Sequence, residues 1–381
     1  MNQSLFLGSR LVLLSLLAVF FASILSVKGN DFAGIPASAE EPDSGAWSAT
    51  DPMEYDRYWF TATTLLDGRI LVTGGYSYES YDLAECELYD GASGHWTETG
   101  KMRFARYNHT ATLLADGRVL VAAGYNGDEM SSAEIYNPAR GSWVRTGSLN
   151  VARDEHAATL LQDGRVLVIG GYTSTIGPTP STETFDPLTG RWTSAGNLRD
   201  GRWWATATTL LDGRVLVTGG VGVSTSNLAT CEIFDPATGT WSSTARMRVG
   251  RYSHTATLLP DGRVLVAGGH ANDYPPTNTA EIFDPSTGTW ASVATMPNAR
   301  ARHTAALLAD GRVLVAGGWN VRVIPWAEIF DPVTSNWSAT GRLLKERDQH
   351  ASAVLPDGRV IVAGGLDRRN FELASAEVFT P

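Results

Sequence analysis

The sequence has little cysteine and little lysine. Only two of its 381 residues are cysteine, so at most one disulfide can form. Lysine occurs three times, and nearly every basic residue is arginine, whose planar group suits fixed hydrogen bonds to carboxylates. The net charge is −10, which argues against a ligand held through phosphate contacts. We therefore expect no nucleic-acid partner.

One long apolar run is present, residues 11–27, directly behind Arg10. Its length is typical of a signal peptide and slightly short for a membrane span. Ala37-Ser38-Ala39 is a cleavage pattern, so we expect residues 1–39 to be a signal peptide, or an N-terminal anchor if it is retained. The protein is then secreted, periplasmic or on the cell surface. Residues 40–46 are interpreted as a short linker.

An internal repeat fills residues 47–381. Asp-Gly-Arg, an apolar run and a Gly pair recur seven times, with starts 47 or 49 residues apart. The second copy ends Ala123-Gly124 in place of the Gly pair. The seven copies begin at Asp67, Asp116, Asp163, Asp212, Asp261, Asp310 and Asp357.

Each copy predicts four strands. Residues 109–124 give two apolar strands around an Asp-Gly turn, the strongest short hairpin signal. Residues 133–143 give a third strand, a turn and a fourth strand that carries Trp143. Four-stranded units repeated radially predict an all-β, single-domain, seven-bladed β-propeller. Trp47 precedes the first complete copy, so we expect the strand around it to complete the seventh blade and to close the ring.

The repeat resembles the kelch family in its paired Gly, its third-strand Glu followed by an aromatic residue, and its fourth-strand Trp. Residues 254–269, HTATLLPDGRVLVAGG, are similar to repeats of exported bacterial kelch proteins. Cys86 and Cys231 occupy the same slot three blades apart. A disulfide needs Cα atoms within roughly 7 Å, so we expect both to be buried and unpaired.

Two polar residues recur in every blade: an Arg ten residues before the Asp-Gly turn, and a Glu in the third strand. One interpretation is a buried Arg–Glu pair in each blade. The alternative is a cationic ring that binds acidic ligands, as the kelch resemblance implies for this slot. A histidine follows the Arg by three residues in five blades. Equivalent slots are too far apart for one metal ion, so packing histidines and no metal are expected.

Candidate site residues gather at one end of the ring, here called the loop face. It carries the loops between second and third strands and the segments that enter first strands. Exposed Trp and Tyr beside Arg are typical of binding surfaces. The candidate ligand-binding residues are Arg57, Tyr58, Trp59, Arg106, Tyr107, Asn108, Arg153, Asp154, Glu155, Arg202, Trp203, Trp204, Arg251, Tyr252, Arg302, Trp319 and Asp348.

Three functions remain open. The first is a recognition module, expected to be monomeric, that binds a glycan or protein partner through the loop face. The second is a carbohydrate-active enzyme resembling mutarotases or epimerases, with Asp154, Glu155 or Asp348 as acid or base. The third is a structural assembly role. No catalytic motif was found, neither cysteine aligns to the loop face as a copper enzyme would require, and no cofactor is expected.

Overall fold

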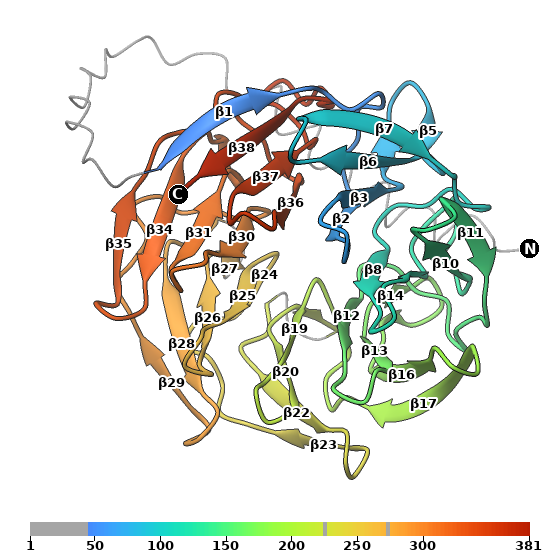
Figure 1. Ribbon diagram of the computed structural model, residues 1–381. Coiled ribbons are helices and arrows are strands. Elements are labelled where there is room, and N and C mark those ends of the chain that lie inside the picture. The colour runs from blue at the N-terminus through green and yellow to red at the C-terminus, as the bar shows by residue number, and fades with distance from the viewer. Residues whose placement is uncertain (1–44, 224–226, 272–274) are drawn as a thin grey trace, which may run out of the picture. The chain divides into compact units, whose positions relative to one another are not determined.

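The computed structural model describes residues 45–223, 227–271 and 275–381, and every regular element in these ranges is a β-strand. Seven four-stranded antiparallel sheets form a ring (Figure 1), together with five two-stranded ribbons. The predicted seven-bladed propeller is confirmed. The predicted signal segment and most of the linker lie outside the described residues. No helix in the described ranges is long and apolar enough to cross a membrane.

In each blade the first strand lies innermost and the fourth outermost. Blade 1 is β2 (Thr61–Thr64), β3 (Ile70–Thr73), β6 (Cys86–Asp90) and β7 (His95–Thr99). Blade 2 is β8 (Thr110–Leu113), β9 (Val119–Ala122), β10 (Ala133–Asn137) and β11 (Ser142–Arg145). Blade 3 is β12 (Ala157–Leu160), β13 (Val166–Ile169), β16 (Ser181–Asp186) and β17 (Arg191–Asn197). Blade 4 is β19 (Thr206–Thr209), β20 (Val215–Thr218), β22 (Cys231–Asp235) and β23 (Thr240–Ser243).

The remaining blades follow the same order. Blade 5 is β25 (Thr255–Leu258), β26 (Val264–Ala267), β28 (Ala280–Asp284) and β29 (Thr289–Ser292). Blade 6 is β30 (Thr304–Leu307), β31 (Val313–Ala316), β34 (Ala327–Asp331) and β35 (Asn336–Ala339). Blade 7 is β36 (Ala351–Val354), β37 (Val360–Ala363), β38 (Ala376–Thr380) and β1 (Ala46–Thr50).

Blade 7 is built from both ends of the propeller, as the position of Trp47 predicted. Strand β1 pairs antiparallel with β38 over five residue pairs, with Trp47 opposite Phe379. The two rings lie 5.2 Å apart between centroids. The hydrogen bonds of β1 therefore cover the edge of the last sheet, which would otherwise be open to pairing with another chain.

The ribbons lie at the loop face. They are β4 (Tyr76–Ser77) with β5 (Tyr81–Asp82), β14 (Tyr172–Thr173) with β15 (Gly177–Pro178), β18 (Arg202–Trp203) with β21 (Val221–Gly222), β24 (Arg251–Tyr252) with β27 (His270–Ala271), and β32 (Trp319–Asn320) with β33 (Arg322–Val323). In blades 4 and 5 the ribbon joins the entering segment to the residues after the Gly pair. Strand pairing therefore holds the segment that enters the first strand against the loop that follows the Gly pair in each of these blades.

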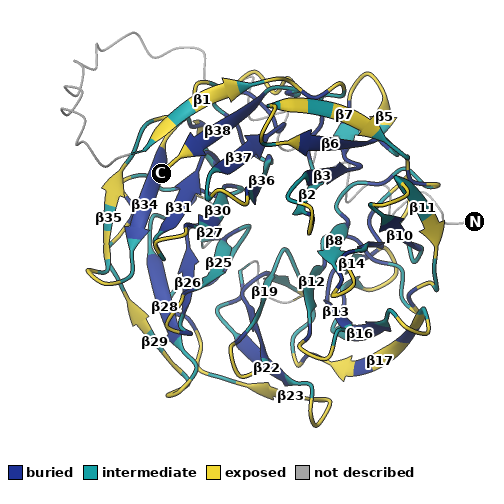
Figure 2. Ribbon diagram, in the orientation of Figure 1, coloured by how far each residue is buried: buried dark blue, intermediate teal, exposed yellow. Residues whose placement is uncertain are grey.

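The apolar core lies between neighbouring blades. The second strands are buried at every position, whereas the fourth strands are mostly exposed, as Figure 2 shows. In six blades the fourth-strand Trp donates its indole N–H to a backbone carbonyl of the preceding blade; Trp143, for example, bonds Gly100 O at 2.7 Å. The fourth-strand tryptophans therefore join each of these blades to the one before it.

Candidate functional site

A buried ion pair lies beneath the loop face in each blade. The Arg–Glu distances run from 2.7 to 3.1 Å, and no arginine side chain in the set is exposed. The predicted structural pair is thus confirmed. The pairs are Arg57–Glu87, Arg106–Glu134, Arg153–Glu183, Arg202–Glu232, Arg251–Glu281, Arg300–Glu328 and Arg347–Glu377.

Arg251 illustrates what the pair fixes. Its Nη1 donates to the carbonyls of Gly268, at 2.7 Å, and Thr279, at 3.0 Å, so it joins both ends of the loop between the second and third strands. Glu281 accepts the backbone N–H of Arg248 at 2.8 Å, which anchors the entering segment. Burial lowers the pKa of Arg251 and Glu281 opposes that shift. Five candidate ligand contacts, the arginines at 57, 106, 153, 202 and 251, are fully enclosed and present no surface to a ligand.

The residue two positions after each of these arginines has a left-handed backbone. Its φ is between 51° and 56° in all seven blades. In six blades its N–H donates to the carbonyl of the equivalent residue in the preceding blade, at 3.0 to 3.4 Å. A left-handed L-residue costs roughly 1–2 kcal/mol, and in six of the seven blades this inter-blade hydrogen bond helps to offset that cost. The seven residues, here called the inner ring, are Trp59, Asn108, Glu155, Trp204, Ser253, Arg302 and Gln349.

The next position holds the five repeated histidines. Each is buried and its Nε2 lies within hydrogen-bond distance of a threonine hydroxyl in the preceding blade; His254, for example, lies 3.0 Å from Thr218 Oγ1. Burial lowers the pKa of His156 and of His254 to about 3. The predicted packing role is confirmed, and these imidazoles are neutral at physiological pH. The five are His109, His156, His254, His303 and His350.

Aromatic side chains at the loop face form two clusters. In blades 1 and 2, Trp59 stacks on Tyr107 with centroids 5.5 Å apart. In blades 3 to 6 a second series runs through Trp203 and Trp204, whose rings are 4.2 Å apart and nearly parallel. The first cluster comprises Tyr58, Trp59, Tyr76, Tyr78, Tyr81, Tyr107 and Tyr125. The second comprises Tyr172, Trp203, Trp204, Tyr252, His270 and Trp319.

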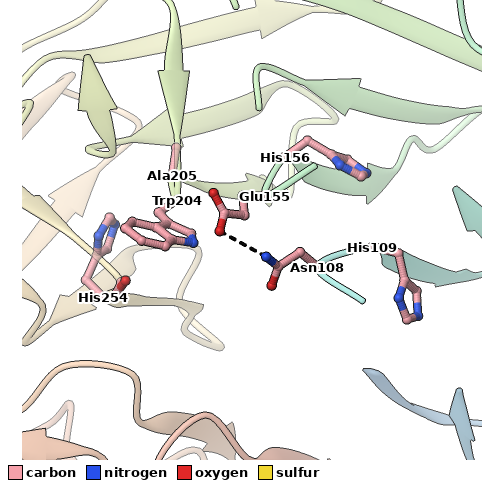
Figure 3. Close-up of a pocket in the computed structure, with 8 residues that line it drawn as sticks. Asn108, His109, Glu155, His156, Trp204, Ala205 and His254 are labelled. Atoms are coloured by element: carbon pink, nitrogen blue, oxygen red, sulfur yellow. Dashed lines mark hydrogen bonds between the residues drawn. The ribbon is translucent and has the colours of Figure 1, made fainter. Parts of the chain in front are cut away.

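A pocket of about 240 Å³ lies at the centre of the loop face, on the inner-ring residues of blades 2 to 5. Asn108 donates from Nδ2 to Glu155 Oε1 at 2.9 Å, and Figure 3 shows this bond facing the indole of Trp204. Ser253, Ala205 and three of the ring histidines complete the lining. The pocket thus combines a carboxylate, an amide, a hydroxyl and an indole.

A larger hollow of about 540 Å³ lies at the opposite end, against the Asp-Gly-Arg turns of blades 5 to 7. Its lining is largely aliphatic, and its one charged residue, Asp357, is paired with Arg359 at 2.6 Å. The pocket at the loop face has the more varied chemistry, so it is the stronger candidate.

The candidate acids differ in placement. Glu155 lines the pocket, whereas Asp154 and Asp348 are 1% and 2% exposed and do not. Burial raises the pKa of Asp348 to about 6, against the opposing effect of Arg302, which lies 3.9 Å away. Tyr58 is likewise buried, and burial raises its pKa. Among the described residues, no group of three or more His, Cys, Asp or Glu is placed to hold a metal ion.

The structure brings three of the predicted residues together in the pocket: Asn108, Glu155 and Trp204. Ser253 was missed as a site residue, although its place two residues after Arg251 is the same as theirs. The two cysteines are unpaired and buried as predicted, and burial raises each pKa to about 12.

Residues 155–365 match the family model of the KLHDC2/KLHL20/DRC7 Kelch-repeats domain, and residues 105–150 match a Kelch motif. The chain belongs to the kelch-repeat family. Comparison with curated proteins gives no match. The kelch propeller is similar to a solved structure of a fungal alcohol oxidase of the AA5 family in complex with copper, with a TM-score of 0.74 and 17% identity. The alignment covers 89% of this chain and 77% of that one, and at this identity it shows a shared fold.

Proposed function

We propose that this kelch propeller is a recognition module that binds a protein partner through its loop face. The observation that carries the proposal is a set of exposed apolar side chains in the loops between second and third strands. They lie in the loops of blades 1, 3, 4, 6 and 7. They are Tyr78, Tyr81, Ile176, Val223, Val321, Trp326 and Phe371.

Seven exposed apolar side chains lie on the loop face, and exposed apolar surface of this kind favours a protein partner. Ile176, Val223 and Val321 are aliphatic, and they offer no ring on which a sugar could stack. Their position at loop tips on a rigid ring is typical of binding residues. The aromatic clusters also suit a glycan ligand. Binding of glycans in place of polypeptides would therefore count against a protein partner.

The first experiment is an array of peptides, proteins and glycans probed with the full chain and with Trp204→Ala. Binding to polypeptides that Trp204→Ala weakens supports the proposal. Leu188→Ala, at a residue 94% exposed on the opposite end of the ring, is the matched control and should bind as the parent does. Equal melting temperatures of the three proteins show that the loss comes from the site. Exclusive binding to glycans, or binding that persists in Trp204→Ala, would overturn the proposal.

A second candidate is a carbohydrate-active enzyme, favoured by one observation: the pKa of Asp348 is raised to about 6, near the range useful for acid–base chemistry. Its carboxyl is 2% exposed, so a substrate would need the blade 6–7 segment to open. An NMR assay of sugar anomerisation with the parent and Asp348→Asn tests it. Acceleration by the parent that Asp348→Asn abolishes would establish this activity.

We further propose that the chain is exported, on the strength of the apolar segment 11–27 and the Ala37-Ser38-Ala39 pattern. N-terminal sequencing of the protein recovered after expression tests both points. A mature terminus at Glu40 supports cleavage, whereas an intact terminus in the cytoplasm would contradict export.

A further inference from the structure

The loop of blade 1 carries three tyrosines on one short hairpin, residues 76–82, here called the tyrosine hairpin. Strands β4 and β5 pair antiparallel within it. Residues 78–81 form its tip and are exposed, as Figure 2 shows for the loop beside β5. Tyr78 is 58% exposed and Tyr81 is 68% exposed. The hairpin therefore presents two phenolic rings to a partner at the loop face.

These two rings are not covered by stacking. Both are nearly perpendicular to the ring of Tyr76: the centroid distance is 5.9 Å for Tyr78 and 6.5 Å for Tyr81, at interplanar angles of 90° and 89°. Tyr78 has one further ring contact, a tilted one with Tyr58 at 6.4 Å. In the described part of the chain neither ring lies parallel on another. Ring surface is thus left for a ligand, and the face of an aromatic ring attracts cations.

Hydrogen bonds hold the hairpin in shape without a ligand. Ser77 Oγ donates to Asp56 Oδ1 at 2.7 Å and accepts the backbone N–H of Glu79 at 3.3 Å. The N–H of Leu83 donates to Gly75 O at 2.9 Å, which closes the loop at its base. A loop that is already ordered loses less conformational entropy when it binds. The two exposed rings therefore occupy fixed positions on the blade.

The surroundings of the hairpin are negatively charged. Burial raises the pKa of Tyr76, and the carboxylates of Asp82 and Glu372 raise it further. Burial likewise raises the pKa of Glu372, and Asp56 and Glu79 add to that shift. Neighbours raise the pKa of a carboxyl group in this way when negative charge outweighs positive charge around it. Four carboxylates therefore act together at this hairpin.

Basic residues do not balance these four carboxylates. The blade 1 loop, residues 74–85, contains neither Lys nor Arg. Arg57, Lys101 and Arg368 lie in neighbouring segments, and each is in an ion pair with a Glu outside the set of four. In the blade 1 loop, the blade 7 loop and the segment that enters blade 1, Arg369 alone is left to oppose the four. The local charge remains negative when it is counted.

We propose that the tyrosine hairpin binds a positively charged segment of a partner protein, with arginine side chains lying on the rings of Tyr78 and Tyr81. The inference rests on the proposed recognition of a protein through the loop face, and it names the chemistry of that protein. A guanidinium group stacks on aromatic rings and keeps its charge. Glu79, at the exposed tip, pairs with the bound segment, and the other three carboxylates attract it at longer range. A neutral glycan would leave all four charges unbalanced, so the charge favours a basic polypeptide.

The test is calorimetric titration of the full chain, at low salt, with three capped pentapeptides: acetyl-Gly-Arg-Gly-Arg-Gly-amide and the forms with citrulline or glutamate in place of both arginines. Citrulline keeps the shape of arginine and removes its charge. We expect the arginine peptide to bind at least about tenfold more tightly than the citrulline peptide, because both the ring contacts and the pairing with Glu79 need the charge. The glutamate peptide should not bind. Added salt should weaken the arginine peptide, since exposed charges are screened.

Two variants locate the site. Tyr78→Ala/Tyr81→Ala should weaken the arginine peptide by at least about fivefold, and Glu79→Gln by about threefold. The matched controls lie on outer strands: Val144→Ala removes an exposed apolar side chain from β11, and Glu98→Gln removes an exposed carboxylate from β7. Each control should change the affinity by less than about twofold. All the altered side chains are exposed, so the melting temperatures should stay equal, and equal values assign the losses to the hairpin.

Equal affinity for the arginine and citrulline peptides would overturn the proposal, as would no detectable binding of the arginine peptide. Losses in Val144→Ala or Glu98→Gln as large as those in the hairpin variants would do so too. Binding of a neutral glycan, in place of the arginine peptide, that Tyr78→Ala/Tyr81→Ala abolishes would assign the hairpin to sugars. The recognition proposal survives each of these results where the array shows polypeptides without basic residues whose binding Trp204→Ala weakens. It fails separately, when Trp204→Ala leaves every array contact unchanged.

Discussion

Burial, rather than distance, should decide how much each arginine stabilises the propeller, and Arg251→Met tests this. Arg251 is fully buried and lies 2.8 Å from Glu281, whereas Arg263 is 34% exposed and lies 2.6 Å from Asp261. Methionine keeps much of the apolar stem in either place. In the buried case it also leaves Glu281 charged, and it removes the arginine donor from the carbonyls of Gly268 and Thr279, of which Thr279 keeps the N–H of Gly268 at 3.1 Å.

Stranding a buried charge costs about 3–5 kcal/mol, a large part of the roughly 5–15 kcal/mol that keeps a typical protein folded. Arg263→Met removes an exposed pair and should cost less than about 1 kcal/mol. The measurement is urea unfolding followed by tryptophan fluorescence and by circular dichroism. Equal losses in the two variants, or a larger loss in Arg263→Met, would refute the reasoning.

The double variant Arg251→Met/Glu281→Leu sharpens the test, because it removes the stranded charge. Its loss should be smaller than the sum of the two single losses by at least about 1 kcal/mol. It should not recover the parent stability, since Glu281 also accepts the N–H groups of Arg248 and Val249, at 2.8 and 3.3 Å. Strict additivity would show that the pair is not coupled.

Three further outcomes are expected. Deleting residues 40–52 removes β1 and uncovers β38, so the protein should melt at a lower temperature and associate, as measured by calorimetry and light scattering; an unchanged monomer would contradict this. Ala123→Gly should raise the free energy of unfolding in urea by up to about 1 kcal/mol, because Ala123 has φ 57°. Gly268→Ala should lower it, because the added Cβ would lie 2.6 Å from Arg300 O. His254 has a pKa of about 3 when folded and 6.5 ordinarily, so the unfolded state binds the extra proton between these values and stability falls as pH drops below 6.5. That loss is about 2 kcal/mol at pH 5, and His254→Phe should remove it from the pH profile of unfolding; an unchanged profile would contradict a neutral buried imidazole.

The fold could be predicted from the sequence because the residues that form a blade recur in every blade. The Asp-Gly turn sets the first hairpin, and the Trp of the fourth strand marks where each blade meets the one before it. Seven copies of the turn and of the Trp, with Trp47 at the start of the propeller, predicted both the number of blades and the closure of the ring. The buried Arg–Glu pair could also be predicted from the sequence, since both partners recur in all seven blades.

The candidate site was harder to predict from the sequence, because it depends on contacts between blades at a position where the residues differ. The left-handed backbone of the inner ring has no sequence signal: it is adopted by Trp59, Glu155 and Arg302 alike, none of which favours positive φ. In six of the seven blades the N–H of this residue donates to the equivalent carbonyl of the preceding blade, and that bond is made by the backbone whatever the side chain. The backbone therefore sets the position of each inner-ring residue, whereas the residue type at that position differs from blade to blade.

This freedom explains why the pocket could arise on so regular a ring. Asn108, Glu155 and Trp204 hold equivalent positions in three consecutive blades, so exchanging one alters the pocket without altering the strands below. The arginine two residues earlier has the opposite property: it is identical in every blade, and its hydrogen bonds hold the loops in place. Substitutions in the inner ring should thus change what is bound at little cost in stability, and substitutions of the arginines should lower stability whatever is bound.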